Sequence, residues 1–299
     1  MTNDTDTTQN RKPRLALMGE FSAGKSTLSN LLLGADPLPV KVTATRLPPV
    51  WISYGENNAM REDLDGYSEP VDIAHLDKVI LEKTRLIRLH LKSDILKICD
   101  LIDMPGICDP NMQAEVWQAV IGEADHVVWC THATQAWRQS EAATWESLPQ
   151  ELHKKSLLLL TRFDKLLSTR DRDRVMKRVK RETRGLFHKV FPVSLTQALA
   201  AGEDNLTWEK SGAEPFVKCL VDLLIRQGSA ELENRRKADH AANPVAPIPD
   251  TPSSVRIMPS RVRAKPGGQR RARGAGPGAP NAIPTLVGDA PLAEMPGNA

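Results

Sequence analysis

The sequence predicts an α/β protein in which a mostly parallel sheet carries helices on both faces. Short strands that are apolar throughout, such as residues 15–18 and 156–160, alternate along the chain with segments of helical spacing, such as 171–187. Strands without polar alternation are typical of parallel sheets, because crossover helices bury both faces of such a sheet. The alternation stops near residue 227, so the predicted domain covers residues 14–227.

The first half of this domain is expected to begin with a strand and a helix. The apolar run at 15–18 predicts the strand, and residues 27–33, closed by Gly34, predict the helix, since glycine is favoured directly after a helix. Two later runs are separated only by polar residues 92–94, which predicts a hairpin. The elements expected here are strand 15–18, helix 27–33, strand 51–54, turns within 57–67, helix 71–83 and strands 86–91 and 95–102.

The second half of the domain continues the alternation of strands and helices. Its basic segment, 171–187, is expected to be a surface helix, because Val175 and Val179 mark a buried side among many charges. The elements expected here are helix 111–123, strand 126–131, helix 140–148, strand 156–160, helix 171–187, strand 190–193 and helix 214–227.

The composition is that of an ordinary globular protein. Apolar residues make up 40% and charged residues 26% of the 299 residues, and a net charge of +3 is too small to indicate nucleic-acid binding by itself. The four cysteines show no C-x-x-C spacing, which favours reduced thiols over a disulfide or zinc framework. No apolar leader and no apolar run of about 18 residues is present. We therefore expect a cytoplasmic protein without a transmembrane segment, whose membrane contact, if any, is peripheral.

Both ends of the chain have compositions typical of disorder. Residues 1–13 are polar, and from residue 240 onward proline and glycine are dense, with arginines gathered within 256–273. Such stretches bury too little apolar surface to offset the entropy of ordering them. Residues 228–299 are expected to form a helical extension and then a disordered Pro/Gly/Arg-rich tail. Its charge leaves contact with anionic lipid or RNA open.

A phosphate-binding pattern, G-x-x-x-x-G-K-S, follows the first strand. Gly19 and Gly24 let the backbone bend so that consecutive N–H groups point at phosphate oxygens, and the following helix adds the positive end of its dipole. Lys25 supplies a charge at the β- and γ-phosphates, and Ser26 supplies a hydroxyl to Mg²⁺. A nucleotide site is therefore expected at the start of helix 27–33.

Three further stretches bear on the nucleotide and its hydrolysis. Asp103, at the end of an apolar run, can hold a water of the Mg²⁺ shell, and the Gly106 N–H can meet a γ-phosphate. Asp164, in Thr-Arg-Phe-Asp, can accept the two adjacent donors of guanine, which adenine lacks. Thr45, and less strongly Thr43, lies in the loop where a hydroxyl can bind Mg²⁺ and a carbonyl can position water.

With these stretches in order, residues 14–227 resemble a dynamin-family GTPase domain. The resemblance rests on Gly-Glu-Phe-Ser-Ala-Gly-Lys-Ser-Thr, Thr-Ala-Thr-Arg-Leu-Pro-Pro-Val, Asp-Met-Pro-Gly and Thr-Arg-Phe-Asp. It implies catalytic roles for Ser22, Lys25, Thr45 and Gly106, a K⁺ or Na⁺ ion near Ser22, and Mg²⁺ at Ser26, Thr45 and Asp103. The implied GTP/GDP contacts are Gly19, Glu20, Phe21, Ser22, Ala23, Gly24, Lys25, Ser26, Thr27, Thr161, Arg162, Asp164, Lys165 and Ser194.

The chain also departs from the dynamin pattern. Arg162 replaces the commoner lysine, a change that keeps charge and stacking capacity. Phe21 stands where dynamins often carry a polar residue that contacts the catalytic water. No helical stalk or lipid-binding domain is visible after residue 227, so assembly into a scission collar is not implied.

We therefore expect a GTPase that hydrolyses GTP to GDP and phosphate with Mg²⁺ and acts as a nucleotide-state switch. No glutamine follows Gly106 and no internal arginine finger can be assigned, so catalysis is expected from Thr45, from Ser22 with a bound cation, and from loops that order against a second subunit. The resemblance to dynamins implies that this second subunit pairs across the nucleotide face. A homodimer or a related GTPase is the expected partner. Two alternatives stay open, namely a ribosome- or RNA-associated small GTPase and a non-catalytic GTP-dependent scaffold.

Overall fold

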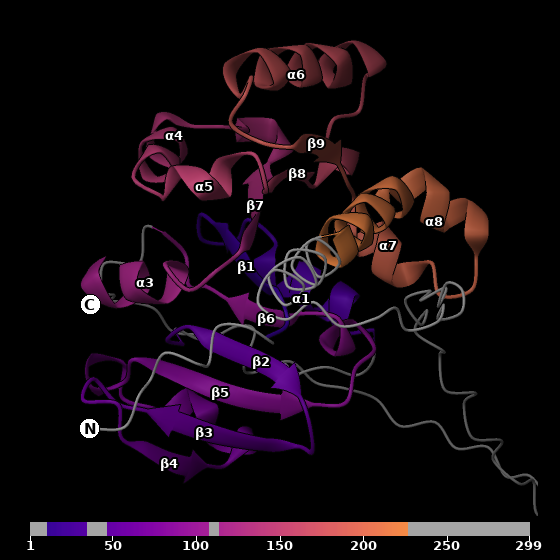
Figure 1. The fold of residues 1–299 in the computed structure, drawn as a ribbon. Coiled ribbons are helices and arrows are strands. Elements are labelled where there is room, and N and C mark those ends of the chain that lie inside the picture. Colours follow the sequence, from indigo (N-terminus) through magenta and orange to yellow (C-terminus); the bar gives the residue numbers. More distant parts are fainter. Residues whose placement is uncertain (1–10, 35–46, 108–113, 227–299) are drawn as a thin grey trace, which may run out of the picture. The chain divides into compact units, whose positions relative to one another are not determined.

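The computed structural model describes residues 11–34, 47–107 and 114–226 (Figure 1). In these residues the strands form one nine-stranded sheet in the order β4-β3-β5-β2-β6-β1-β7-β8-β9. The strands are β1 (Arg14–Gly19), β2 (Val50–Tyr54), β3 (Asn58–Glu62), β4 (Ser68–Val71), β5 (Leu86–Leu91), β6 (Asp100–Asp103), β7 (His126–His132), β8 (Leu157–Thr161) and β9 (Lys189–Pro192).

Helices occupy most of the connections between the strands. The α-helices are α1 (Lys25–Leu33), α3 (Ala114–Ile121), α4 (Gln139–Glu146), α5 (Gln150–His153), α6 (Thr169–Glu182), α7 (Leu195–Ala200), α8 (Asn205–Ser211) and a further helix over 213–226. Short 3₁₀ turns are η1 (Ile73–Lys78), η2 (Leu81–Lys83), η3 (Ile95–Lys97), η4 (Ala133–Gln135) and η5 (Phe163–Lys165).

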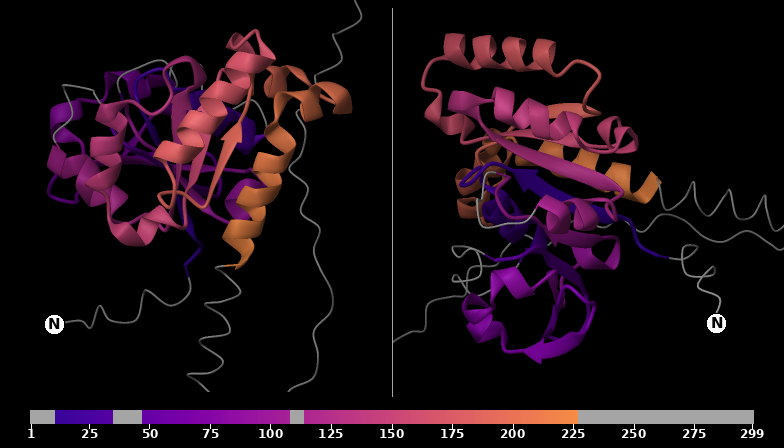
Figure 2. Two further views of the ribbon diagram at one scale, coloured as in Figure 1. Left: turned by 90° about the horizontal axis from the view of Figure 1, so that it is seen from above. Right: turned by 90° about the vertical axis from the view of Figure 1, so that its left-hand side faces the viewer.

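The strands β6, β1, β7, β8 and β9 are parallel and have an apolar layer on each face. On β1, Leu15 and Leu17 belong to one layer, and Ala16 and Met18 belong to the other. The first layer is covered by α1, α7 and the helix 213–226, and the second by α3, α4, α5 and α6 (Figure 2). The predicted α/β architecture is confirmed. These strands are apolar throughout because both of their faces are buried.

The hairpin expected between 86–91 and 95–102 is wrong. Strand β2 lies between β5 and β6, parallel to β5 and antiparallel to β6. Residues 95–97 form the 3₁₀ turn η3 instead of continuing a strand, and Ile95, Leu96 and Cys99 fill the core. The run is apolar because this turn is buried. Periodicity alone does not distinguish a buried turn from a buried strand.

The helix expected over 71–83 is also absent. Strand β4 ends at Val71, and two 3₁₀ turns follow, with Asp72 accepting a hydrogen bond from the backbone of Ala74 at 2.9 Å. This side-chain contact favours a tight turn over an α-helix. Strand β3 was missed within 57–67, where turn signals dominate; only Asp63–Tyr67 forms the turn, closed by a 3.0 Å backbone hydrogen bond.

Candidate nucleotide-binding site

The phosphate-binding pattern forms a sharply bent loop between β1 and α1. Gly19, Ser22 and Gly24 all have positive φ angles, of 140°, 58° and 95°. A Cβ atom on Gly19 would lie 2.1 Å from the carbonyl oxygen of Cys130 on the neighbouring strand β7. Only glycine fits there, because the backbone conformation and the close approach both exclude a side chain. Ser26 and Thr27 follow in the first turn of α1.

Lys25 is buried beneath this loop and points its ammonium group back into it. Its Nζ donates to the carbonyl oxygens of Gly19 at 3.0 Å and Glu20 at 2.9 Å. Burial lowers the pKa of Lys25, and the nearby Asp103 carboxyl opposes this effect. A buried ammonium held by neutral carbonyls is ready to exchange them for phosphate oxygens, which form stronger, charge-assisted contacts.

The segment Asp103–Gly106 packs directly against the phosphate loop. Its Met104 N–H donates to Leu17 at 3.2 Å, and the Ile107 N–H donates to Gly19 at 3.3 Å. A Cβ atom on Gly106 would lie 3.0 Å from the backbone nitrogen of Phe21. The structure thus brings the segment with the two predicted site residues Asp103 and Gly106 into contact with the predicted phosphate loop.

The surroundings of Asp103 disfavour the charged form of its carboxyl group, because they supply too little positive charge. Removal from bulk water raises the pKa of Asp103 to about 6, and the charge of Lys25 acts in the opposite direction. A divalent cation would supply the missing charge, so the carboxyl of Asp103 and the hydroxyl of Ser26 fit a Mg²⁺ site completed by phosphate oxygens and water. Within the described residues, no group of three or more His, Cys, Asp or Glu side chains forms a metal site by itself.

The stretch predicted to bind guanine, residues 161–164, begins with two residues that support the phosphate loop. Thr161, buried at the end of β8, donates through Oγ1 to the carbonyl of Ala23 at 2.8 Å. Arg162 has a positive φ of 53° and donates through Nη2 to the carbonyl of Ser22 at 3.0 Å. Asp164 and Lys165 lie on the next turn, η5, with Lys165 Nζ 3.8 Å from Asp164 Oδ2. Thr161 and Arg162 therefore reach the loop, whereas Asp164 lies on the turn that follows them.

Ser194 lies on the loop between β9 and α7, beside the same site. The Phe163 N–H donates to the Val193 carbonyl at 3.4 Å, which joins this loop to residues 161–164. Ser194 is buried, and its Oγ has no hydrogen-bond partner within the described part of the chain. Its neighbour Leu195 limits the space at Gly24, where a Cβ atom would lie 3.2 Å away. Ser194 is thus placed beside the other predicted site residues.

Two of the predicted residues, Thr43 and Thr45, lie outside the described residues. Conversely, the sequence interpretation missed Arg138 and Ser140, which hydrogen-bond the carboxylate of Glu20 in the phosphate loop at 2.8 Å and 2.7 Å. They lie 118 and 120 residues from Glu20 along the chain and belong to no recognised sequence motif. The general tendency of α/β proteins to bind ligands at the carboxyl ends of parallel strands could have drawn attention to the segment after β7.

A bent glycine loop between a central parallel strand and a helix, with a buried lysine inside it and an aspartate beside it, defines a P-loop nucleoside triphosphatase. Residues 15–163 match the dynamin family. The chain therefore carries a dynamin-family GTPase domain, in agreement with the resemblance seen in the sequence.

The chain is also similar to dynamin-like relatives and shares its fold with a solved structure. The chain is 24% identical to dynamin-like protein 2 of Campylobacter jejuni over 220 residues, which is 70% of this chain and 34% of that protein. It is 27% identical to a probable chloroplastic transmembrane GTPase, FZO-like, of Arabidopsis thaliana over 70% of this chain and 23% of that protein. A bacterial dynamin structure aligns with a TM-score of 0.62 and 21% identity, covering 78% of this chain and 49% of that chain.

The chain thus spans about a third or less of the length of these two relatives. In the described residues, no helix has the length and apolar character needed to cross a membrane.

Proposed function

We propose that the protein binds GTP with Mg²⁺, hydrolyses it to GDP and phosphate, and changes the state of its switch segments with the bound nucleotide. The observation that carries this proposal is the convergence of distant stretches on one loop. Thr161 and Arg162 bond to Ala23 and Ser22, and the segment after Asp103 bonds to β1 and Gly19. One site can therefore bind the base and the phosphates of a nucleotide together with a metal ion on those phosphates.

In this proposal each group has a distinct task. Lys25 exchanges its loop carbonyls for phosphate oxygens, and the loop N–H groups surround the same oxygens. When bound, Mg²⁺ would neutralise charge on the β- and γ-phosphates, with Ser26, Asp103 and Thr45 as the proposed holders. Loss of the γ-phosphate would remove a partner of the Gly106 N–H and so release the segment that packs on Phe21.

The test of base recognition is a competition experiment with Asp164. Wild-type protein should prefer GTP over ATP by a large factor, because one carboxylate accepts both adjacent guanine donors. Asp164→Asn should move the preference toward xanthosine triphosphate, whereas the exposed helix variant Asp173→Asn should keep the wild-type preference. Equal competition by ATP and GTP in the wild type would exclude guanine recognition.

We further propose that turnover is activated by pairing across the nucleotide face and by K⁺ or Na⁺ near Ser22. The exposed position of Phe21 on the phosphate loop, 75% of its surface, leaves an apolar side chain at that face. Specific activity should then rise over a hundredfold increase in protein concentration in potassium and fall strongly in Ser22→Ala and Thr45→Ala. A flat profile that is unchanged in a bulky organic cation would favour activation by a separate partner. Measurable GTP affinity without turnover would instead indicate a scaffold.

The cytoplasmic location and the contact of the basic tail with anionic lipid or RNA stay predictions. They rest on composition and on residues outside the described part of the chain.

A further inference from the structure

The phosphate loop carries a negative charge at its second position, Glu20. The Glu20 carbonyl oxygen accepts one of the two hydrogen bonds that hold Lys25, at 2.9 Å, so this residue belongs to the part of the loop that holds the Lys25 ammonium group. A free carboxylate next to a triphosphate would repel it, because like charges interact strongly where water is partly excluded. The charge of Glu20 therefore needs a partner.

That partner is a pair of side chains at the start of α4, namely Arg138 directly before the helix and Ser140 in its first turn. Arg138 Nη1 donates to Glu20 Oε2 at 2.8 Å, and Ser140 Oγ donates to Glu20 Oε1 at 2.7 Å. Both carboxylate oxygens are thus occupied, and the Glu20 side chain is 14% exposed against 45% for Arg138. The contact turns the carboxylate toward α4.

The segment that presents Arg138 is itself fixed by a buried carboxylate, Glu141. Glu141 Oε2 accepts the Arg138 backbone N–H at 2.9 Å and the Thr131 hydroxyl at 2.8 Å, and Oε1 accepts the Trp129 indole N–H at 3.0 Å. Trp137 takes a positive φ of 59°, with its N–H donating to Thr131 Oγ1 at 3.1 Å. Backbone strain of this kind persists only where the surroundings hold it, so Arg138 is preorganised toward the loop.

We propose that Arg138 is a positioning residue for the nucleotide, with Ser140 as its auxiliary. It neutralises Glu20 and holds the Gly19–Glu20 stretch, whose carbonyls orient Lys25, in the shape that accepts a triphosphate. This inference rests on the proposed GTP site. It assigns Arg138 a role through Glu20 and not a contact with the reacting atoms.

The test compares Arg138→Ala, Glu20→Gln and the double variant by titration with a slowly hydrolysed GTP analogue and with GDP. Arg138→Ala should weaken binding of the GTP analogue by about tenfold or more, since it leaves a charge unpaired beside phosphate, and should weaken GDP binding less. Glu20→Gln should restore the affinity of the double variant for the analogue. Arg181→Ala on α6, whose side chain is 75% exposed, is the matched control and should bind as wild type does.

A milder variant guards against a folding defect. Ser140→Ala removes one hydrogen bond to the Glu20 carboxylate but leaves the charge of Arg138 in place, so a smaller loss in the same direction, again restored by Glu20→Gln, supports the inference. Equal weakening of GDP and analogue binding without rescue would mean that Arg138 only stabilises the fold, and would overturn it. A lower kcat at unchanged analogue affinity would overturn it in favour of direct contact with the transferred phosphate. If the wild type bound no guanine nucleotide, the proposed function would fail first, and the inference with it.

Discussion

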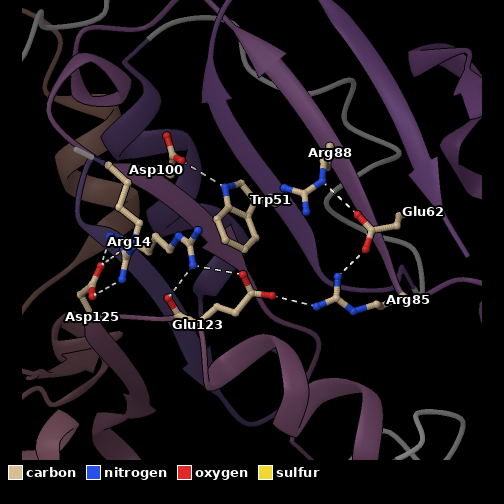
Figure 3. A network of polar contacts seen from close by, with 9 residues as sticks. Arg14, Trp51, Glu62, Arg85, Arg88, Asp100, Glu123 and Asp125 are labelled. Atoms are coloured by element: carbon tan, nitrogen blue, oxygen red, sulfur yellow. Dashed lines mark hydrogen bonds and ion pairs between the residues drawn. The ribbon is translucent and has the colours of Figure 1, made fainter. Parts of the chain in front are cut away.

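The two parts of the sheet differ in where their charged residues lie. The part made of β6, β1, β7, β8 and β9 is parallel and apolar on both faces, and the charged residues on its strands lie at the strand ends, as do Arg14, Asp100, Asp103 and Lys189. The part made of β2, β5, β3 and β4 contains antiparallel pairs and carries ionised side chains on the strands themselves. Figure 3 shows that these charges form a continuous network where the two parts meet.

Glu62 is the central carboxylate of this network. It accepts hydrogen bonds from Arg85 and from Arg88, the latter at 3.0 Å, and Arg85 also donates to Glu123 at 2.7 Å. On the other side, Arg14 donates to Glu123 at 3.0 Å. The network therefore connects β3 and β5 to β1 and to the segment before β7.

Trp51 on β2 lies within the same network. The guanidinium groups of Arg14 and Arg88 lie 4.5 Å and 5.1 Å from its ring centroid, and its indole N–H donates to Asp100 at 3.3 Å. Strand β1 thus begins in this network with Arg14 and ends in the phosphate loop with Gly19. The candidate nucleotide site lies on the parallel part of the sheet, and ion pairs hold the junction with the other part. Substitutions in the site should therefore change mainly GTP affinity, and substitutions in the network should change mainly the free energy of unfolding.

The largest effect is expected from Lys25→Ala, which removes the buried ammonium group. Loss of charge-assisted contacts to phosphate should cost ~2–3 kcal/mol or more, so GTP affinity should fall by well over tenfold while the fold is kept. Titration calorimetry measures the loss, and urea unfolding checks the fold. The exposed variant Lys177→Ala is the control. Unchanged GTP affinity in Lys25→Ala would show that the loop does not bind phosphate.

The next effect concerns Asp103, whose pKa is raised to about 6 from 3.8. The folded state then keeps a proton that the unfolded state has released, so the free energy of unfolding should fall as pH rises between these values. The loss reaches about 3 kcal/mol once pH is well above 6. Asp103→Asn should remove this loss, and nucleotide-free variant protein should be more stable than wild type at pH 8.

Urea unfolding at pH 4 and pH 8 measures the effect on stability. The same variant should lose Mg²⁺-dependent GTP binding. The two measurements separate the effect of the carboxyl on stability from its proposed role in holding Mg²⁺. If wild type and Asp103→Asn showed the same pH dependence, the assigned environment of Asp103 would be wrong.

The smallest effect is expected from Glu62→Gln in the charge network. It leaves Arg85 and Arg88 short of a carboxylate, but both arginines are partly exposed, so the free energy of unfolding should fall by only about 1–2 kcal/mol. GTP affinity should stay as in wild type. Glu56→Gln, with a side chain that is 83% exposed, should change neither quantity. A loss of GTP affinity in Glu62→Gln at unchanged stability would break the division between the two parts.

The sequence by itself determined the class of the fold and predicted where the candidate nucleotide site lies. Gly19, Gly24, Lys25 and Ser26 belong to one strand–loop–helix unit, so their proposed roles follow from local spacing. The strands around them are apolar throughout because both faces are buried, which a short window of sequence records. For the same reason the predicted strands at 15–18, 126–131 and 156–160 match β1, β7 and β8 closely.

Only the tertiary structure decided which segments pair and which side chains meet. Strand β2 inserts between β5 and β6, and this replaces the expected hairpin, because strand order depends on contacts between distant residues and not on the pattern within either strand. Arg138 meets Glu20 across a separation of 118 residues, a contact that no motif encodes. Periodicity reports whether a residue is buried, whereas its partner is chosen by the packing of the whole sheet.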